Sequence, residues 1–177
     1  MKLINLFGSP GAGKSTGAAY ISAKLKMRGI EAELITEHAK DKVWENSLDV
    51  LKNQLYIVGQ QSLRTTRLDG KVEVAVTDSP LMLSILYREH FLYPEFDNLI
   101  YKVFSSYDNI NYFIERDKPY NPKGRLQSEK ESDELSLRTI QMLDKYNIPY
   151  IKIKGNESQY NIVVEDICKM FESDKER

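Results

Sequence analysis

Residues 8–16 fit the pattern G-x-x-x-x-G-K-[ST] with the sequence Gly8-Ser9-Pro10-Gly11-Ala12-Gly13-Lys14-Ser15-Thr16. The run Lys2 to Phe7 before this stretch is typical of a buried strand, and residues Lys14 to Arg28 after it are typical of a helix that Gly29 ends. A strand, a glycine-rich turn and a helix in this order form a cradle for phosphate, because backbone N–H groups and the helix N-terminus point at one anion. The stretch therefore predicts a nucleotide-binding α/β fold.

The residue types of this phosphate-binding loop (P-loop) match the chemistry of a nucleoside triphosphate. Its glycines let backbone N–H groups turn inward, Lys14 bridges the β- and γ-phosphate oxygens, and the Ser15 hydroxyl is a ligand for Mg²⁺. A glycine-rich βα turn with a chance lysine is the alternative. We expect ATP and Mg²⁺ as cofactors. The predicted nucleotide contacts are Gly8, Ser9, Gly11, Ala12, Gly13, Lys14, Ser15 and Thr16.

Five short apolar runs bounded by turn residues recur along the chain, with helix-length segments between them. Alternating strands and helices predict a P-loop NTPase fold, in which helices cover both faces of a five-stranded, mainly parallel sheet. We expect one domain over residues 1–177. The expected strands are Lys2 to Phe7, Glu33 to Thr36, Val72 to Thr77, Asn111 to Ile114 and Tyr150 to Ile153.

Three further helices are predicted from apolar spacing and end signals. Apolar residues at helical spacing indicate one long helix from Ser47 to Leu68, stopped by Asp69-Gly70. Ser128 and Glu131 have the spacing of a capping box, which opens a helix that reaches about Tyr146. The closing helix is expected from Asn156 to Glu172.

Composition excludes several classes of protein. The 177 residues contain 25 Lys+Arg and 26 Asp+Glu, so the net charge of -1 disfavours sequence-independent nucleic-acid binding. No run of 18 apolar residues is present, and the one cysteine, Cys168, excludes an intrachain disulfide. We expect no signal peptide, no membrane partner and a cytoplasmic location. The oligomeric state stays open, with a homodimer as one arrangement.

Asp78 follows the strand-like run Val72 to Thr77 and is the candidate second ligand for Mg²⁺. A helix cap is the alternative role, because Asp-Ser-Pro is typical of a helix start. The next residue is Ser79, where motor ATPases usually carry a water-activating glutamate, and no N-K-x-D motif for guanine occurs. Transfer to an acceptor is therefore favoured over hydrolysis.

Glu37 follows the second strand, so we expect it at the same sheet edge as the P-loop, as the base that takes a proton from the acceptor. A solvated turn glutamate is the alternative, and His38 beside it is interpreted as a packed residue.

Gln61 and Arg64 on the following helix are candidate substrate contacts, since an amide reads a base edge and a guanidinium meets phosphate or ribose. A solvated helix face is the alternative.

Residues 116–127 combine cations with two prolines and a glycine, and we interpret them as a lid. Arg116 and Arg125 would stabilise the charge on the transferred phosphoryl group when the lid closes. An exposed connection with ordinary basic residues is the alternative.

The chain resembles the P-loop kinases of nucleosides and nucleotides. It is most similar to the small AAA-labelled ATP-binding proteins common in phages and to the related nicotinamide-riboside kinase domain. The resemblance rests on G-S-P-G-A-G-K-S-T, T-E-H-A-K-D, T-D-S-P and R-D-K-P-Y-N-P-K-G-R in this order. It implies that Glu37 lies near the acceptor, that Asp78 is the metal-site acid and that Arg125 is the lid arginine.

The expected activity is that of an ATP-dependent phosphotransferase, a kinase acting on a small nucleoside- or nucleotide-like acceptor. Two alternatives remain open. One is an ATP-binding and hydrolysing switch module that acts through a partner protein. The other is a kinase of a hydroxyl group in nucleic acid, which the lid-side cations allow and the net charge disfavours.

Overall fold

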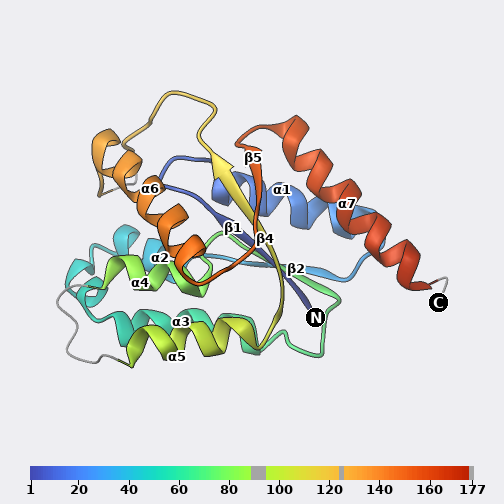
Figure 1. Cartoon of the computed structure of the whole chain (residues 1–177), viewed down its shortest axis with the longest axis horizontal. Coiled ribbons are helices and arrows are strands. Elements are labelled where there is room, and N and C mark those ends of the chain that lie inside the picture. Colours follow the sequence, from blue (N-terminus) through green and yellow to red (C-terminus); the bar gives the residue numbers. More distant parts are fainter. Residues whose placement is uncertain (89–94, 124–125, 176–177) are drawn as a thin grey trace.

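The protein is described by a computed structural model that covers residues 1–88, 95–123 and 126–175. One or more helices separate successive strands along the described chain, as Figure 1 shows. They are β1 (Lys2–Phe7), α1 (Lys14–Met27), β2 (Ala32–Ile35), α2 (His38–Trp44), the 3-10 helix η1 (Leu48–Lys52), α3 (Gln54–Thr66), β3 (Val74–Thr77), the 3-10 helix η2 (Leu81–Leu83), α4 (Ser84–Tyr87), α5 (Phe96–Ser105), β4 (Asp108–Glu115), α6 (Glu129–Lys145), β5 (Ile151–Lys154) and α7 (Glu157–Lys175).

The five strands form one sheet in the order β2-β3-β1-β4-β5, and every neighbouring pair is parallel. This confirms the predicted α/β class and the parallel sheet. The β4 strand begins at Asp108, earlier than the predicted Asn111, because residues from Asp108 onward pair with β1 from Lys2 onward. Pairing with a central strand thus extends β4 into a polar stretch that periodicity alone does not identify as strand.

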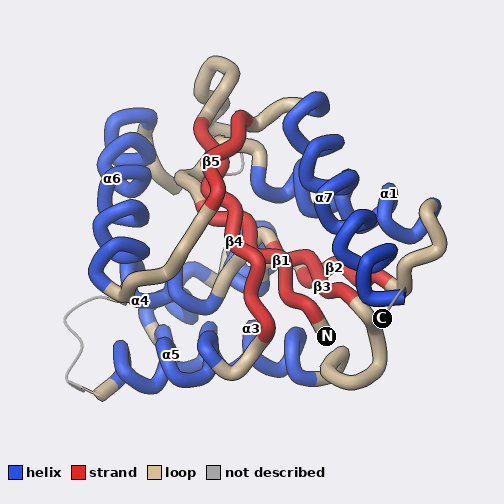
Figure 2. The backbone as a smooth tube through the Cα atoms, turned by 45° about the vertical axis from the view of Figure 1, so that its right-hand side comes forward, coloured by secondary structure: helices blue, strands red, loops and turns tan. Residues whose placement is uncertain are grey.

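The side chains of β1 point alternately to the two faces of the sheet, and the core accordingly has a layer on each face. Ile4 and Leu6 pack with residues of α1 and α7 on one face of the sheet. Phe7 packs on the other face with residues of η2, α5 and α6. Successive strand side chains point to opposite faces, so one apolar strand supplies both layers. Figure 2 shows the sheet between α1 and α7 on one side and α3 to α6 on the other.

The single long helix predicted from Ser47 to Leu68 is wrong. The chain instead forms the short η1 and then α3, and the break lies at Asn53. The Asn53 side chain accepts a hydrogen bond of 3.1 Å from the backbone N–H of Tyr56 and caps α3. Asparagine favours such capping over a helix interior, so a local polar contact overrides the apolar spacing.

Other expectations from helix signals agree with the structure. The capping box is formed by Ser128 and Glu131 at the start of α6, and Gly29, directly after the C-cap residue of α1, has the φ of 80° expected of a glycine that ends a helix. The helix α5, which we did not predict, buries Phe96, Ile100 and Phe104 at four-residue spacing. Among the described helices, none combines the length and apolar character needed to cross a bilayer.

Candidate functional site

The P-loop occupies the carboxyl end of β1, where β3 and β4 flank the strand. Its backbone turns at Gly8 and Gly13, whose φ angles are 141° and 109°. A Cβ atom on Gly8 would lie 2.7 Å from the carbonyl oxygen of Ile114, and one on Gly13 would lie 2.5 Å from the Tyr160 hydroxyl oxygen. Both the positive φ and the lack of room therefore require glycine at these two positions.

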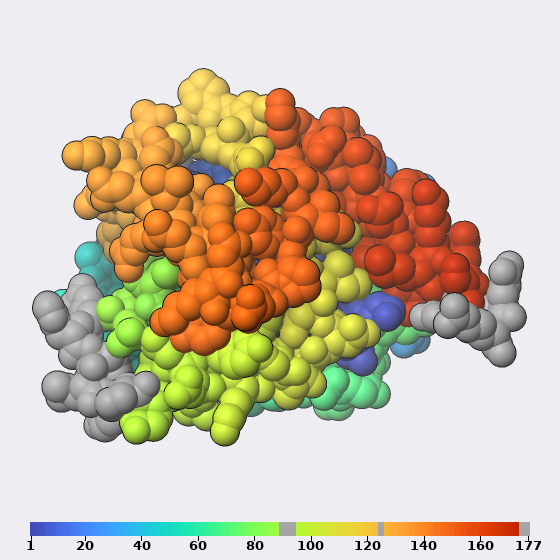
Figure 3. Space-filling view, in the orientation of Figure 1, coloured from blue at the N-terminus to red at the C-terminus, as the bar shows by residue number. Residues whose placement is uncertain are grey.

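Two side chains from distant parts of the sequence hold the loop in this shape. Tyr160 of α7 donates a hydrogen bond of 3.0 Å to the carbonyl oxygen of Gly13. Ser132 of α6, which is fully buried, donates one of 2.7 Å to the carbonyl oxygen of Pro10. Figure 3 shows a hollow between the segment after β4 and α6, with atoms of the N-terminal part of the chain at its floor. The sequence carries no local signal for the hydrogen bonds from Tyr160 and Ser132, because both depend on tertiary packing.

Lys14 begins α1 directly after the loop. Its ammonium nitrogen donates hydrogen bonds to the carbonyl oxygens of Gly8, at 2.8 Å, and Ser9, at 3.1 Å. Ser15 and Thr16, which follow it, are exposed at the helix start. The ammonium thus lies over the loop, beside the helix N-terminus that would receive the phosphates.

Asp78 lies directly after β3 and is 4% exposed. Its Oδ1 atom is buried and has no hydrogen-bond partner among the described residues. The capping role left open by the sequence is not formed, because the following η2 has Pro80 at its N-cap and no side-chain capping bond. A buried, unpartnered carboxylate oxygen in one cavity with the Ser15 hydroxyl fits a hard cation such as Mg²⁺, which keeps several waters and takes few protein ligands.

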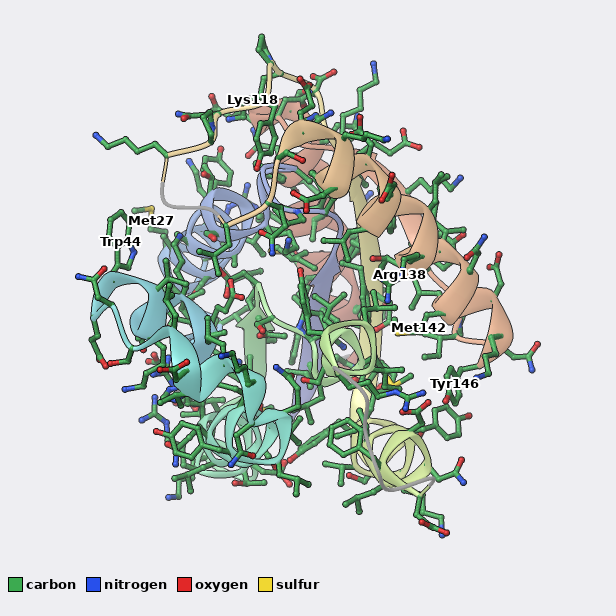
Figure 4. All side chains as sticks on the ribbon, turned by 90° about the vertical axis from the view of Figure 1, so that its left-hand side faces the viewer. Met27, Trp44, Lys118, Arg138, Met142 and Tyr146 are labelled. Carbon is green, nitrogen blue, oxygen red and sulfur yellow. The ribbon has the colours of Figure 1, made fainter. Side chains whose placement is uncertain are left out.

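A cavity of about 230 Å³ opens beside the P-loop. It reaches from the predicted metal ligands to one face of α2, where Glu37, Lys40, Asp41 and Trp44 recur at helical spacing. Figure 4 shows Trp44, 62% exposed, at the outer edge of the molecule. Of these four residues, the sequence predicted only Glu37 as part of the site. The helical spacing from Glu37 is the signal that identifies the other three as lining residues.

Glu37 is the N-cap residue of α2 and lines this cavity with Ser15 and Asp78. Burial raises the pKa of the Glu37 carboxyl above its ordinary value; the nearby Lys14 ammonium opposes this rise and the Asp78 carboxylate adds to it. Burial and, after it, the Glu37 carboxylate raise the pKa of the Tyr87 hydroxyl to about 12. Tyr87 of α4 therefore lies within electrostatic range of Glu37. A carboxylate with a raised pKa is suited to accept a proton near neutral pH.

Gln61 and Arg64 lie on α3 behind the Glu37 turn. Gln61 is 4% exposed, and its amide bonds to the backbone of Thr36 and His38. Arg64 bonds to Thr36 and pairs with Asp41. The interpretation of His38 as a packed residue agrees with its 6% exposure and its edge-on contact with the Tyr56 ring. Substrate contact by Gln61 and Arg64 stays a prediction, since neither residue is among those that line the cavity.

Arg116 lies just after β4, at the start of the predicted lid. Its guanidinium pairs with Asp133 at 2.6 Å and with Glu129 at 3.3 Å, both on α6. In this arrangement Arg116 joins the end of β4 to α6, and its approach to a phosphoryl group stays a prediction. Arg125 lies outside the described residues, so its predicted role is carried by the sequence alone.

Comparison with known proteins identifies a family and a fold. Residues 3–159 match the family described as AAA domain. None of the curated proteins compared with this chain matches it.

Solved structures with the same fold include two kinases. Deoxyadenosine kinase from M. mycoides with bound dATP is 19% identical, with a TM-score of 0.57 over 94% of this chain and 99% of that chain. The same enzyme with the products dCMP and a flexible dCDP is 18% identical, with a TM-score of 0.54 over 98% and 100%. The APS kinase of Mycobacterium tuberculosis in complex with AMPPNP and APS is 14% identical, with a TM-score of 0.52 over 97% of each chain. The chain thus has the fold of P-loop kinases.

Proposed function

The chain belongs to the AAA domain family, and from this premise we propose that it is an ATP-dependent phosphotransferase acting on a small nucleoside- or nucleotide-like acceptor. The observation that carries the proposal is the cavity that brings Glu37 together with Ser15 and Asp78. A carboxylate next to the predicted metal ligands has room beside it for an acceptor of modest size. The kinase fold of the solved neighbours supports the same conclusion.

Each residue of the site has a part in this transfer. The backbone N–H groups of the P-loop and the Lys14 ammonium would hold the β- and γ-phosphates, and Ser15 and Asp78 would hold Mg²⁺. When bound, Mg²⁺ neutralises charge on the phosphate oxygens. Glu37 would accept the proton of the acceptor hydroxyl. At the same time the hydroxyl oxygen of the acceptor bonds to the γ-phosphorus, and the bond between the γ-phosphorus and the β–γ bridging oxygen breaks. The products are ADP and the phosphorylated acceptor.

Hydrolysis as the main activity lacks a base at its usual place. The residue after Asp78 is Ser79, whose backbone N–H donates a hydrogen bond of 3.1 Å to the Thr77 hydroxyl. A serine at this position does not activate water as a glutamate does. The cavity instead contains the carboxylates of Glu37, Asp41 and Asp78, of which Glu37 would serve as the base.

The test measures ADP formed from ATP and Mg²⁺ with and without a panel of nucleosides and nucleotides. We expect ADP formation to depend on one class of acceptor, with γ-labelled phosphate recovered on that acceptor. Glu37→Gln should remove this dependence, because the amide keeps the shape of the side chain but cannot take the proton.

Each other outcome contradicts the proposal in a distinct way. ADP formation that no acceptor changes would indicate a switch module. Label recovered on DNA or RNA rather than on a free nucleoside would indicate a kinase of nucleic acid. Equal acceptor-dependent turnover in Glu37→Gln and the parent would remove Glu37 from the chemistry.

A further inference from the structure

The turn that carries Glu37 is bracketed by one buried amide. Gln61 of α3 donates a hydrogen bond of 3.3 Å from its amide nitrogen to the carbonyl oxygen of Thr36. Its amide oxygen accepts a bond of 3.0 Å from the backbone N–H of His38. One side chain therefore pairs the backbone groups on both sides of Glu37. The bond to the His38 N–H is buried, and a buried backbone group needs such a partner.

Arg64, three residues further along α3, also contacts this turn. It bonds both to Thr36 and to the first helical turn of α2. It donates hydrogen bonds of 3.0 Å to the Thr36 carbonyl oxygen and 2.8 Å to the Thr36 hydroxyl. Its other terminal nitrogen lies 2.5 Å from an Asp41 carboxylate oxygen and 3.3 Å from the His38 ring. The fork of donors thus ties the end of β2 to α2, as a planar guanidinium is suited to do.

This arrangement matters because the backbone of the turn sets where the Glu37 carboxylate lies. Glu37 is the N-cap of α2, where its side chain makes no capping hydrogen bond, and its backbone is extended with φ -67° and ψ 118°. A general base must lie within hydrogen-bond reach of the proton that it takes, and a displacement of about 1 Å can lower a rate by about 100-fold. Supporting residues commonly supply this precision.

We propose that Gln61 and Arg64 are positioning residues that hold the Thr36–His38 turn, so that the Glu37 carboxylate points into the cavity, and that they do not read the acceptor. The inference rests on the proposed function, in which Glu37 takes the proton of the acceptor. It replaces the contact with substrate that the sequence predicts for both residues, since their amide and guanidinium groups bond to the chain itself.

The kinetic test uses Gln61→Met and Arg64→Ala, with one residue of α3 and its C-cap residue as matched controls. Gln61→Met keeps the length and packing of the side chain and loses both hydrogen bonds, and Gln60→Met is its control. Arg67→Ala is the control for Arg64→Ala. We expect kcat and kcat/KM to fall together by ~10–100-fold for every acceptor, with the KM for the acceptor unchanged. Arg64→Lys, which keeps the charge and one donor, should recover part of the loss.

A raised KM for the acceptor at unchanged kcat, or a loss confined to one class of acceptor, would overturn the proposal and indicate contact with substrate. Controls that lose as much activity as the test variants would also overturn it. Thermal unfolding of each variant, followed by circular dichroism, separates a folded protein with a displaced turn from an unfolded one.

A second measurement does not depend on activity. The hydrogen exchange of the His38 backbone amide, followed by NMR, reports directly on its bond to Gln61. We expect exchange at least ~10-fold faster in Gln61→Met than in the parent and in Gln60→Met. Equal exchange in all three proteins would refute the clamp. If the parent protein shows no acceptor-dependent transfer, the proposed function fails, whereas the exchange experiment still decides whether Gln61 holds this turn.

Discussion

Glu37→Gln should lower activity and raise stability at the same time. The side chain lies in the cavity beside Asp78 and Lys14, and burial raises its pKa above the ordinary value. At neutral pH the ionised carboxylate is therefore less favourable in the folded chain than in the unfolded chain. The amide of glutamine carries no charge and nearly the same shape. Because Glu37 makes no capping bond in α2, the change removes no such contact.

The sign of the stability effect follows from proton linkage. A carboxyl whose pKa is higher in the folded state binds more protons there, so stability falls as the pH rises through the unfolded pKa of about 4.3 and on through the raised folded pKa. The gain in the free energy of unfolding from Glu37→Gln should be absent below about pH 4 and present at pH 7. A pKa difference of one corresponds to about 1.4 kcal/mol, and 1 kcal/mol changes the Tm of a chain of this size by roughly 2–4 °C. Even a modest rise in the pKa thus gives a measurable difference.

Two assays on one preparation check this prediction. Thermal unfolding of the variant and the parent at pH 4 and pH 7 measures the stability difference. Steady-state kinetics should show acceptor-dependent kcat lowered by ~10²–10⁴-fold, the range for loss of a general base. In the parent, kcat should fall as the pH is lowered through the raised pKa of Glu37, and the variant should lack this fall. Equal Tm values at pH 7 together with equal turnover would refute the reasoning.

Four further predictions concern the rest of the site. Lys14→Ala should lower ATP-dependent turnover by at least ~100-fold in a folded protein, as circular dichroism and a turnover assay will show, because one preorganised contact to the phosphates is lost. Asp78→Asn should weaken the response to Mg²⁺, and an unchanged Mg²⁺ titration would remove Asp78 from the metal site. Tyr160→Phe removes the donor to the Gly13 carbonyl and should lower the free energy of unfolding by about 1 kcal/mol, measured in urea. Arg125→Ala should lower kcat and kcat/KM together at nearly unchanged ATP affinity, and kinetics equal to those of the parent would contradict the predicted lid role.

The local sequence was sufficient for the P-loop and the elements around it. Gly8 and Gly13 occupy turns with positive φ that only glycine fills without strain, so the motif itself specifies the backbone there. The capping box at the start of α6 is likewise local, because Ser128 and Glu131 bond to each other. Asp78 and Glu37 could be placed at the loop because the carboxyl ends of parallel strands meet at one sheet edge.

Tertiary structure alone decided what surrounds these residues. The supports from Tyr160 and Ser132 reach the loop from helices far away in the sequence, so no spacing identifies them. The polar spacing of Gln61 and Arg64 was compatible with a solvated face, a substrate contact or a buried clamp. Periodicity tells which residues share a helix face but not what that face meets. Only the packing of α3 against the end of β2 shows that both side chains bond to the turn that carries Glu37.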